Sequence, residues 1–249
     1  DVYKRQLLYP FTNCTNCGPR YTIIRSLPYD RPRTTMAHFN MCPECRMEYT
    51  EPLDRRFHAQ PNACPVCGPE LEWRDNNSLS PAGGEPLDRA VQALDDHRVV
   101  GIKGLGGFHL AASAYSTRAV ARLRERKNRP TKPLAIMIRD LETARRLCHI
   151  SPAAHQLLAS NSCPIVLLQK KDDCGLADNL APGLDELGVM LPYTPLHHLL
   201  FAHPQAPACL VMTSGNAAGE PLCKDNDDAL QRLGSFCDGF LLHNRIIHT

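Results

Sequence analysis

Residues 42–69 read CPECRMEYTEPLDRRFHAQPNACPVCGP, with two Cys-x-x-Cys pairs that are 18 residues apart. Two thiolates spaced in this way can bind one metal ion from a tight turn, and two such pairs complete a tetrahedral site. A disulfide framework is the alternative. We expect zinc instead, because no apolar signal segment precedes the pairs. The spacing therefore predicts that Cys42, Cys45, Cys64 and Cys67 hold a structural Zn²⁺ ion.

The second half of this pattern occurs twice. Asn13–Pro19 (NCTNCGP) resembles Asn62–Pro69 (NACPVCGP), and in both the Gly after the second Cys is expected to take a positive φ that turns backbone N–H groups toward sulfur. By this repeat, Cys14 and Cys17 close an earlier module whose opening pair would fall before Asp1. We therefore expect half of a second metal site, and a chain that is part of a longer protein.

Composition narrows the class of protein. The 249 residues carry 28 Lys and Arg against 26 Asp and Glu, a formal net charge of +2, and 43% of them are hydrophobic. This composition excludes a disordered or collagen-like chain and predicts no membrane span and a cytoplasmic location. The small net charge also argues against a protein that coats nucleic acid. Six single cysteines are predicted to be small buried apolar residues: Cys148, Cys163, Cys174, Cys209, Cys223 and Cys237.

The chain divides by composition into three parts. Residues 1–73 are predicted to be zinc-finger modules, the first incomplete, 74–86 a linker or loop, and 87–249 an α/β domain with a twisted, mostly parallel or mixed sheet. Periodicity and caps predict helices at 86–97, 116–127, 140–148, 151–159, 195–201 and 225–233. Strands are predicted at 99–103, 134–138, 164–169, 188–191, 209–213 and 239–243.

A glycine-rich stretch, KGLGGFH, follows the first of these strands at Lys103–His109. Bare backbone N–H groups in such a stretch can face an anion. A tight glycine turn that lets two elements pack closely explains the same residues. It matches neither the P-loop nor the dinucleotide-binding pattern, so the sequence leaves both interpretations open.

A basic run begins on the 116–127 helix and continues beyond it. Such a run is usually a solvated face, but here the segment KNRPTKP at 127–133 should leave the helix and stiffen into an extended entry to the next strand. Cations held there suit a polyphosphate. The run comprises Arg118, Arg122, Arg124, Arg126, Lys127, Arg129, Lys132 and Arg139.

Hydroxyl and amide side chains follow the 209–213 strand in the sequence Thr213-Ser214-Gly215-Asn216. The carboxyl end of a strand is where open α/β sheets usually bind ligands. A simple turn with a helix cap is the alternative.

Taken together, these segments resemble the hydrogenase maturation carbamoyltransferases, the HypF family. The resemblance rests on the stretches 13–37 and 42–69 in the cysteine-rich part, and on KGLGGFHLA (103–111), RERKNRPTKPLAIMIRD (124–140), LGVMLPYTPLHHLL (187–200) and MTSGNAAGEPL (212–222). It covers nearly the whole chain and corresponds to the family's zinc modules and YrdC-like domain. The family's acylphosphatase-like and kinase-like domains have no counterpart here.

The resemblance implies a function and a set of site residues. A YrdC-like domain would join carbamate, derived from carbamoyl phosphate, to ATP, and the family then transfers the carbamoyl group to the carboxy-terminal cysteine of the partner HypE. It implies that Lys127 and Arg129, with Lys132 in support, hold the phosphates and carbamate, and that Thr213, Ser214 and Asn216 bind nucleotide or carbamate oxygens. Lys103 and His109 would line the opposite wall, and Mg²⁺ is expected with ATP. We expect this chain alone not to complete the reaction.

Two alternatives remain. A threonylcarbamoyl-adenylate synthase of tRNA modification shares the Lys-x-Arg and Ser-x-Asn pattern, but the four-cysteine module fits it poorly. A zinc-finger nucleic-acid-binding protein would use the basic run on phosphates, although the small net charge argues against it.

Overall fold

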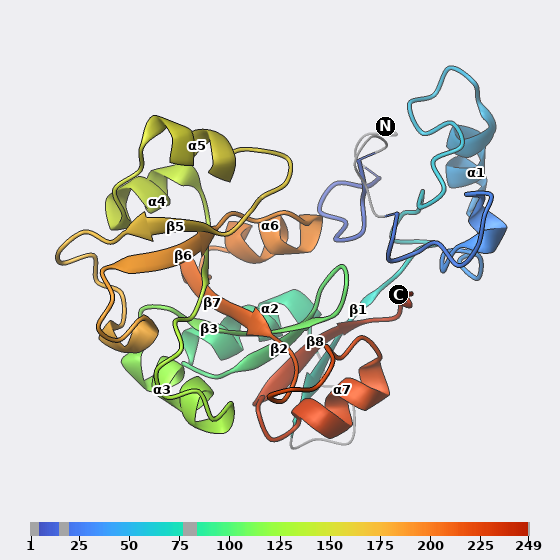
Figure 1. Ribbon diagram of the computed structural model, residues 1–249. Helices are drawn as coiled ribbons and strands as arrows, with labels where there is room; N and C mark the ends of the chain where they lie inside the picture. Colours follow the sequence, from blue (N-terminus) through green and yellow to red (C-terminus); the bar gives the residue numbers. More distant parts are fainter. Residues whose placement is uncertain (1–4, 15–19, 77–83, 249) are drawn as a thin grey trace.

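The computed structural model describes residues 5–14, 20–76 and 84–248. Within them an eight-stranded sheet, in the order β1-β8-β2-β3-β7-β4-β6-β5, organises the chain beyond the cysteine-rich part (Figure 1). The strands are β1 Leu71–Asp75, β2 Val100–Lys103, β3 Phe108–Ser113, β4 Ile136–Ile138, β5 Val166–Gln169, β6 Glu186–Met190, β7 Cys209–Ser214 and β8 Gly239–His243. The helices are α1 Pro43–Thr50, α2 Pro86–Asp95, α3 Thr117–Arg126, α4 Leu141–Leu147, α5 Pro152–Leu158, α6 Pro195–Ala202 and α7 Asn226–Leu233, with 3₁₀ turns at Arg31–Arg33 and Asp178–Leu180.

The sheet is mixed, which confirms one of the two predicted forms. β2 runs parallel to β8, and β4 runs parallel to β6. The remaining neighbours are antiparallel. The β2–β3 pair is antiparallel because the two strands are joined by only Gly104–Gly107, and a parallel pair would need a long crossover.

Helices cover both faces of the sheet. Apolar residues of α3, α4, α5 and α7 share one buried cluster with one face, and those of α2 and α6 share another with the opposite face. Successive residues of a strand point to opposite sides, so in β7 Val211 belongs to the first cluster while Leu210 and Met212 belong to the second. Strands buried on both faces explain the continuous apolar runs in the sequence.

The predicted helices and strands of the α/β part are present, with boundaries shifted by a few residues. The predicted caps at Asp140 and Ser151 are confirmed, because both side chains accept backbone N–H groups at the starts of their helices, and Ser116 and Asp225 cap α3 and α7 in the same way. Three elements were missed: α1, β1 and β3. β3 was not predicted because it lies at the end of the glycine-rich stretch and in the alanine-rich residues after it, and glycine and alanine have low strand propensity.

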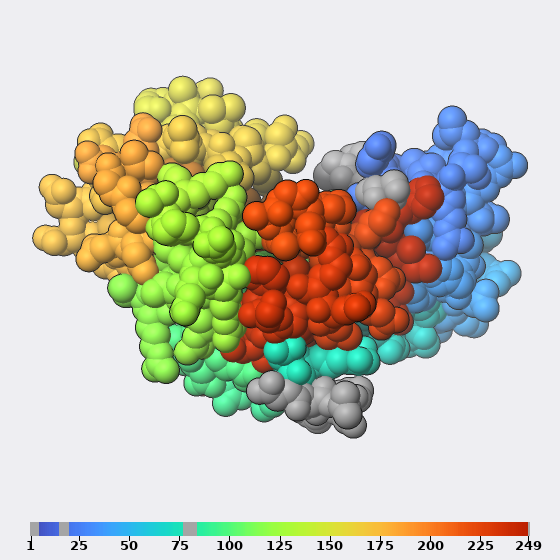
Figure 2. All heavy atoms as spheres, turned by 60° about the horizontal axis from the view of Figure 1, so that its bottom comes forward, coloured from blue at the N-terminus to red at the C-terminus, as the bar shows by residue number. Residues whose placement is uncertain are grey.

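The cysteine-rich part lies at one end of the sheet and forms its own small core of Tyr9, Phe11, Ile23, Met36 and Ala63. Figure 2 shows the blue amino-terminal part of the chain beside the red carboxy-terminal part. β1 pairs with β8 at the edge of the sheet and therefore carries the chain directly from one part into the other. It crosses the division expected at residue 73, and the three-part division itself stays a prediction.

Four of the six single cysteines are buried as predicted, and Cys163 and Cys174 are half-buried. No helix within the described ranges is long and apolar enough to cross a lipid bilayer.

Candidate functional site

The four predicted zinc ligands converge. The Sγ atoms of Cys42, Cys45, Cys64 and Cys67 all lie within 4.8 Å of one another, with Cys42–Cys64 at 3.7 Å and Cys64–Cys67 at 3.8 Å. Zn–S bonds of about 2.3 Å in a tetrahedron place sulfurs about 3.8 Å apart, so the donor set fits a zinc ion. These cysteines are free and not in disulfides. In the part of the chain that is described, they form the one group of three or more potential ligands.

Buried polar groups hold the two cysteine pairs together. Glu48, on the helix that begins after Cys42, accepts hydrogen bonds from Arg56 Nη1 at 3.2 Å and from Asn62 Nδ2 at 3.1 Å. Asn62 Nδ2 also donates to the backbone oxygen of Cys45 at 3.1 Å, so one amide ties the first pair to the segment that carries the second. Such contacts around a metal site orient its ligands.

The glycine after Cys67 was predicted for the wrong reason. Gly68 is not among the residues with positive φ. A Cβ there would run into the Tyr9 hydroxyl and would lie 2.5 Å from the Ala63 Cβ, so glycine is needed for close packing against the small core. Of the expected half site, Cys14 is exposed, and Cys17 lies outside the described residues.

In the α/β part, β7 carries predicted polar residues at its carboxyl end. Ser214 is the last residue of β7, and its Oγ donates to Asn216 Oδ1 at 2.6 Å. Asn216 Nδ2 donates to the backbone oxygen of Glu220 at 2.7 Å, which fixes the amide plane. No helix starts here, since α7 begins at Asn226, so the helix-cap explanation of this motif is wrong.

The basic segment after α3 reaches this strand end. α3 stops at Arg126, as the proline-rich continuation predicted, and Asn128 takes a φ of 49°. Asn tolerates this left-handed conformation better than most residues. Across the turn, Lys127 Nζ donates to the backbone oxygens of Ser214 at 2.5 Å and Asn216 at 2.8 Å, and Arg129 Nη1 donates to Thr213 Oγ1 at 3.1 Å.

The site is strongly cationic. Lys127 is only 6% exposed, and burial together with the charge of Arg129 lowers the pKa of its amino group to about 8. Within the described ranges, neither residue forms an ion pair with a carboxylate. Burying a cation without a counter-ion costs free energy, so the buried Lys127 favours an anionic ligand that would stabilise its charged form.

Only part of the predicted basic run belongs to this site. Arg122 and Arg126 pair with Asp238, at 3.4 and 2.7 Å. Arg124 turns the other way and donates to five backbone oxygens. Residues on a helix point in directions about 100° apart, so a linear run of charges could not show which cations share a face.

Arg124, which the sequence placed among the cations of the basic run, is instead a positioning residue. It is 7% exposed, and its guanidinium donates to the backbone oxygens of Asn179, Leu180, Arg129, Pro130 and Lys132. These bonds hold the 129–132 loop against the turn at 178–180. The Lys132 side chain is exposed, and its supporting role in the site stays a prediction.

The glycine-rich stretch is a tight turn. Gly104 N donates to Gly107 O at 2.8 Å, and a Cβ at Gly104 would lie 3.0 Å from the His109 ring. His109 is half-buried, and the desolvation of its ring lowers its pKa and favours the neutral form. His109 pairs with Ser214 across β3 and β7. Lys103 Nζ instead donates to Asn226 Oδ1 at 2.7 Å and to the backbone oxygen of His243 at 3.0 Å, and its place in a ligand site stays a prediction.

Two family patterns match the chain. The Sua5/YciO/YrdC family, described as telomere recombination, matches residues 92–249, which is more than half of the chain. The pattern described as the HypF finger matches residues 1–24 and 41–73.

Relatives of similar sequence carry both parts. Carbamoyltransferase HypF of Rhodobacter capsulatus is 52% identical over 239 residues, which cover 96% of this chain and 31% of that protein. Carbamoyltransferase HypF of a Synechocystis species is also 52% identical, over 99% of this chain and 32% of the relative. The chain thus spans about a third of the length of these relatives.

Solved structures of HypF proteins have the same fold as this chain. Full-length HypF in its phosphate- and nucleotide-bound form superposes with a TM-score of 0.90 at 50% identity, over 98% of this chain and 31% of that one. HypF of T. kodakarensis superposes with a TM-score of 0.94 at 47% identity, over 100% and 32%. P. abyssi Sua5 shares the fold over 61% of this chain and 47% of its own, at 21% identity and a TM-score of 0.54. The chain therefore belongs to the Sua5/YciO/YrdC family and, with its HypF finger, is a homologue of the HypF carbamoyltransferases.

Proposed function

We propose that this chain provides the adenylate-forming site of a HypF-type carbamoyltransferase of [NiFe]-hydrogenase maturation, in the cytoplasm. The observation that carries the proposal is the pair of cations, Lys127 and Arg129, held at the carboxyl end of β7 with no carboxylate partner among the residues that the structure describes. A nucleotide-bound HypF structure of the same fold supports the ligand class. The substrates would be ATP and carbamate derived from carbamoyl phosphate.

In the proposed reaction a carbamate oxygen attacks the α-phosphorus of ATP. An O–P bond forms, the bond between the α-phosphorus and its bridging oxygen breaks, and pyrophosphate leaves with that electron pair. Negative charge develops on the phosphate oxygens, and preorganised cations stabilise it without having to reorganise. Lys127 and Arg129 are positioned for this role, and Thr213, Ser214 and Asn216 orient the ligand. Carbamate is already an anion, so no general base is required.

Zinc and magnesium would have separate roles. The four thiolates would hold Zn²⁺ as a structural ion, because tetrathiolate sites leave no open position for a substrate. Mg²⁺ would accompany ATP and neutralise phosphate charge.

The other steps of carbamoyl transfer would take place outside this chain. The acceptor of the carbamoyl group would be the carboxy-terminal cysteine of HypE. Cleavage of carbamoyl phosphate and the final transfer would depend on parts of the relatives that this chain does not span.

Pyrophosphate exchange tests the proposal. The zinc-loaded chain should exchange labelled pyrophosphate into ATP with ammonium carbamate, and not with bicarbonate plus threonine. The reverse result would favour threonylcarbamoyl-adenylate synthesis. Nucleotide-independent RNA or DNA binding with a steep salt dependence, and no exchange, would favour the nucleic-acid-binding alternative.

Variants test the residues. Lys127→Met and Arg129→Met should each weaken ATP binding about 10- to 100-fold, because a hydrogen bond from a charged group is worth about 1.5–3 kcal/mol. Zinc content should not change. Arg118→Met is the matched control, since it removes an exposed cation from the first turns of α3. Wild-type ATP affinity in both site variants would refute the assignment.

A further inference from the structure

An exposed loop, residues 216–222, follows the end of β7 and returns to the sheet at Cys223. The backbone fixes both ends of this 216–222 loop, because Gly215 N donates to Phe108 O at 2.8 Å and Cys223 N donates to Gly215 O at 3.0 Å. The residues between these ends are exposed or half-buried, so packing contributes little to their position. Polar contacts have to hold the middle of the loop in place.

The loop fixes the side chain of Asn216, which we propose orients the ligand. Asn216 Nδ2 donates to Glu220 O at 2.7 Å, and Asn216 Oδ1 accepts from Ser214 Oγ at 2.6 Å. Lys127 Nζ donates to the same Oδ1 at 3.4 Å and to the backbone oxygen of Asn216 at 2.8 Å. The position of Glu220 therefore determines how the Asn216 amide faces the site cation.

Arg232 holds Glu220 from the neighbouring helix α7. Its Nε and Nη2 donate to Glu220 Oε2 at 3.2 and 2.7 Å, and Nη2 also donates to the backbone oxygen of Pro221 at 3.1 Å. Its Nη1 donates to Asp228 Oδ2 at 2.8 Å, one helical turn earlier. One planar guanidinium thus joins the loop to a fixed point on the helix.

Helix α7 is a rigid support for this contact. Ala229 and Leu233 are buried in the cluster on one face of the sheet, and Asp225 caps the first turn. The Arg232 side chain itself is 27% exposed. An exposed ion pair of this kind adds little to the stability of a fold. Its main consequence is where the loop lies.

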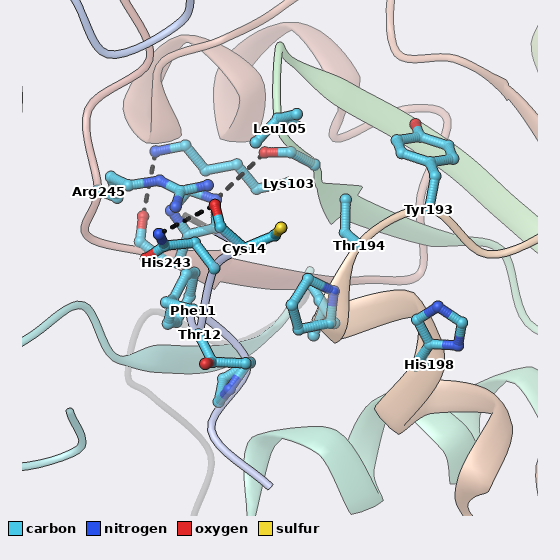
Figure 3. Close-up of a pocket in the computed structure, with 15 residues that line it drawn as sticks. Phe11, Thr12, Cys14, Lys103, Leu105, Tyr193, Thr194, His198, His243 and Arg245 are labelled. Carbon is cyan, nitrogen blue, oxygen red and sulfur yellow. Dashed lines mark hydrogen bonds between the residues drawn. The ribbon is translucent and has the colours of Figure 1, made fainter. Parts of the chain in front are cut away.

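The 216–222 loop also contacts the opposite wall of the predicted site. A Cβ at Gly107 would run into the Leu222 side chain, so Leu222 lies directly on the turn between β2 and β3. The start of this turn lines a cavity of about 260 Å³ together with Lys103 and Arg245 (Figure 3). Because Lys103 is one of the predicted site residues, we assign this cavity to the same site. The loop therefore extends from the end of β7 to that wall.

We propose that Arg232 is a positioning residue of the nucleotide site, which acts through Glu220 to hold the 216–222 loop and the Asn216 amide. The inference rests on the proposed function, because it concerns how the same site binds ATP. The Arg232 side chain contacts the loop and α7, and its effect reaches the ligand through Asn216. Without Arg232 the loop keeps its fixed ends but loses the contact that orients this amide.

Two near-isosteric substitutions test the proposal. Glu220→Gln and Asp228→Asn each remove one negative charge beside Arg232, but only the first changes its contact with the loop. Calorimetric titration of the zinc-loaded chain with ATP and Mg²⁺ should show about three- to ten-fold weaker binding in Glu220→Gln and in Arg232→Met. Asp228→Asn should stay within about two-fold of the wild type. The Tm of all three variants should stay within about 2 °C, because exposed ion pairs contribute little to stability.

Two further measurements separate positioning from a general loss of structure. In pyrophosphate exchange, Glu220→Gln and Arg232→Met should raise the KM for ATP but leave the rate at saturating ATP within about two-fold, because Lys127 and Arg129 remain in place. Without nucleotide, hydrogen–deuterium exchange of the 216–222 backbone amides should be faster in these two variants and unchanged in Asp228→Asn.

The outcomes distinguish this inference from the proposed function. Wild-type ATP affinity in Arg232→Met, or equal effects of Glu220→Gln and Asp228→Asn, would overturn the positioning role. A wild-type chain that binds no ATP would refute the proposed function instead. Hydrogen exchange would then still decide about the loop: faster exchange in Arg232→Met supports its attachment by Arg232, and unchanged exchange refutes it.

Discussion

Replacing Arg124 by Met tests how the 129–132 loop is held. The guanidinium donates five hydrogen bonds to backbone oxygens, the shortest to Asn179 O at 2.6 Å and to Arg129 O at 2.7 Å. Charged hydrogen bonds contribute about 1.5–3 kcal/mol each, but here three acceptors share Nη1, and removing the buried charge also relieves its desolvation cost of several kcal/mol. We expect a net loss of about 3 kcal/mol in the free energy of unfolding.

Thermal unfolding of the zinc-loaded chain measures the effect. For a chain of this size, 1 kcal/mol corresponds to about 2–4 °C, so the Tm should fall by about 6–12 °C. ATP affinity should fall as well, because Arg129 loses the support of its loop. Arg118→Met, on the same helix but exposed, should change the free energy of unfolding by no more than about 0.5 kcal/mol. If Arg124→Met unfolds within about 1 °C of the wild type, the inferred role of these hydrogen bonds is wrong.

Two further predictions concern the metal and the pH dependence of stability. Elemental analysis should find one zinc ion per chain, lost in Cys64→Ala and retained in Cys163→Ala, which changes a half-buried cysteine outside the cluster; a Cys64→Ala protein that keeps its zinc would contradict the ligand set. The pKa of Lys127 is lowered by burial to about 8 from 10.5, so between these pH values the unfolded chain binds more protons and the wild type gains stability with rising pH. Lys127→Met lacks that gain, and denaturant unfolding of both proteins at pH 8 and pH 10 should show the difference in favour of the wild type increasing; no change in it would contradict the lowered pKa.

Local patterns made parts of the structure predictable. The four zinc ligands come in two Cys-x-x-Cys pairs, and each pair is set by a single turn of chain, so its spacing specifies the site. Helix starts are similarly local, because a Ser or Asp side chain caps an N–H group only two or three residues away. The end of α3 was predictable because the prolines after it disfavour helical geometry.

Contacts between distant segments were not predictable in the same way. The sequence places Arg124, Arg126 and Lys127 in one basic run. In the structure Arg124 donates to the 129–132 loop, Arg126 pairs with Asp238, and Lys127 donates to the end of β7. Which role each takes depends on the partner that its helix face meets.

By itself, the sequence determined the cysteine site, the alternation of helices and strands, and the polar residues at the end of β7. Only the tertiary structure decided that β1 would join the sheet beside β8, and that Lys103 and Arg245 would meet at one cavity. The physical reason is the separation along the chain over which each kind of interaction acts. Turns and caps act over a few residues, whereas burial and charge compensation depend on strand pairing between segments more than a hundred residues apart.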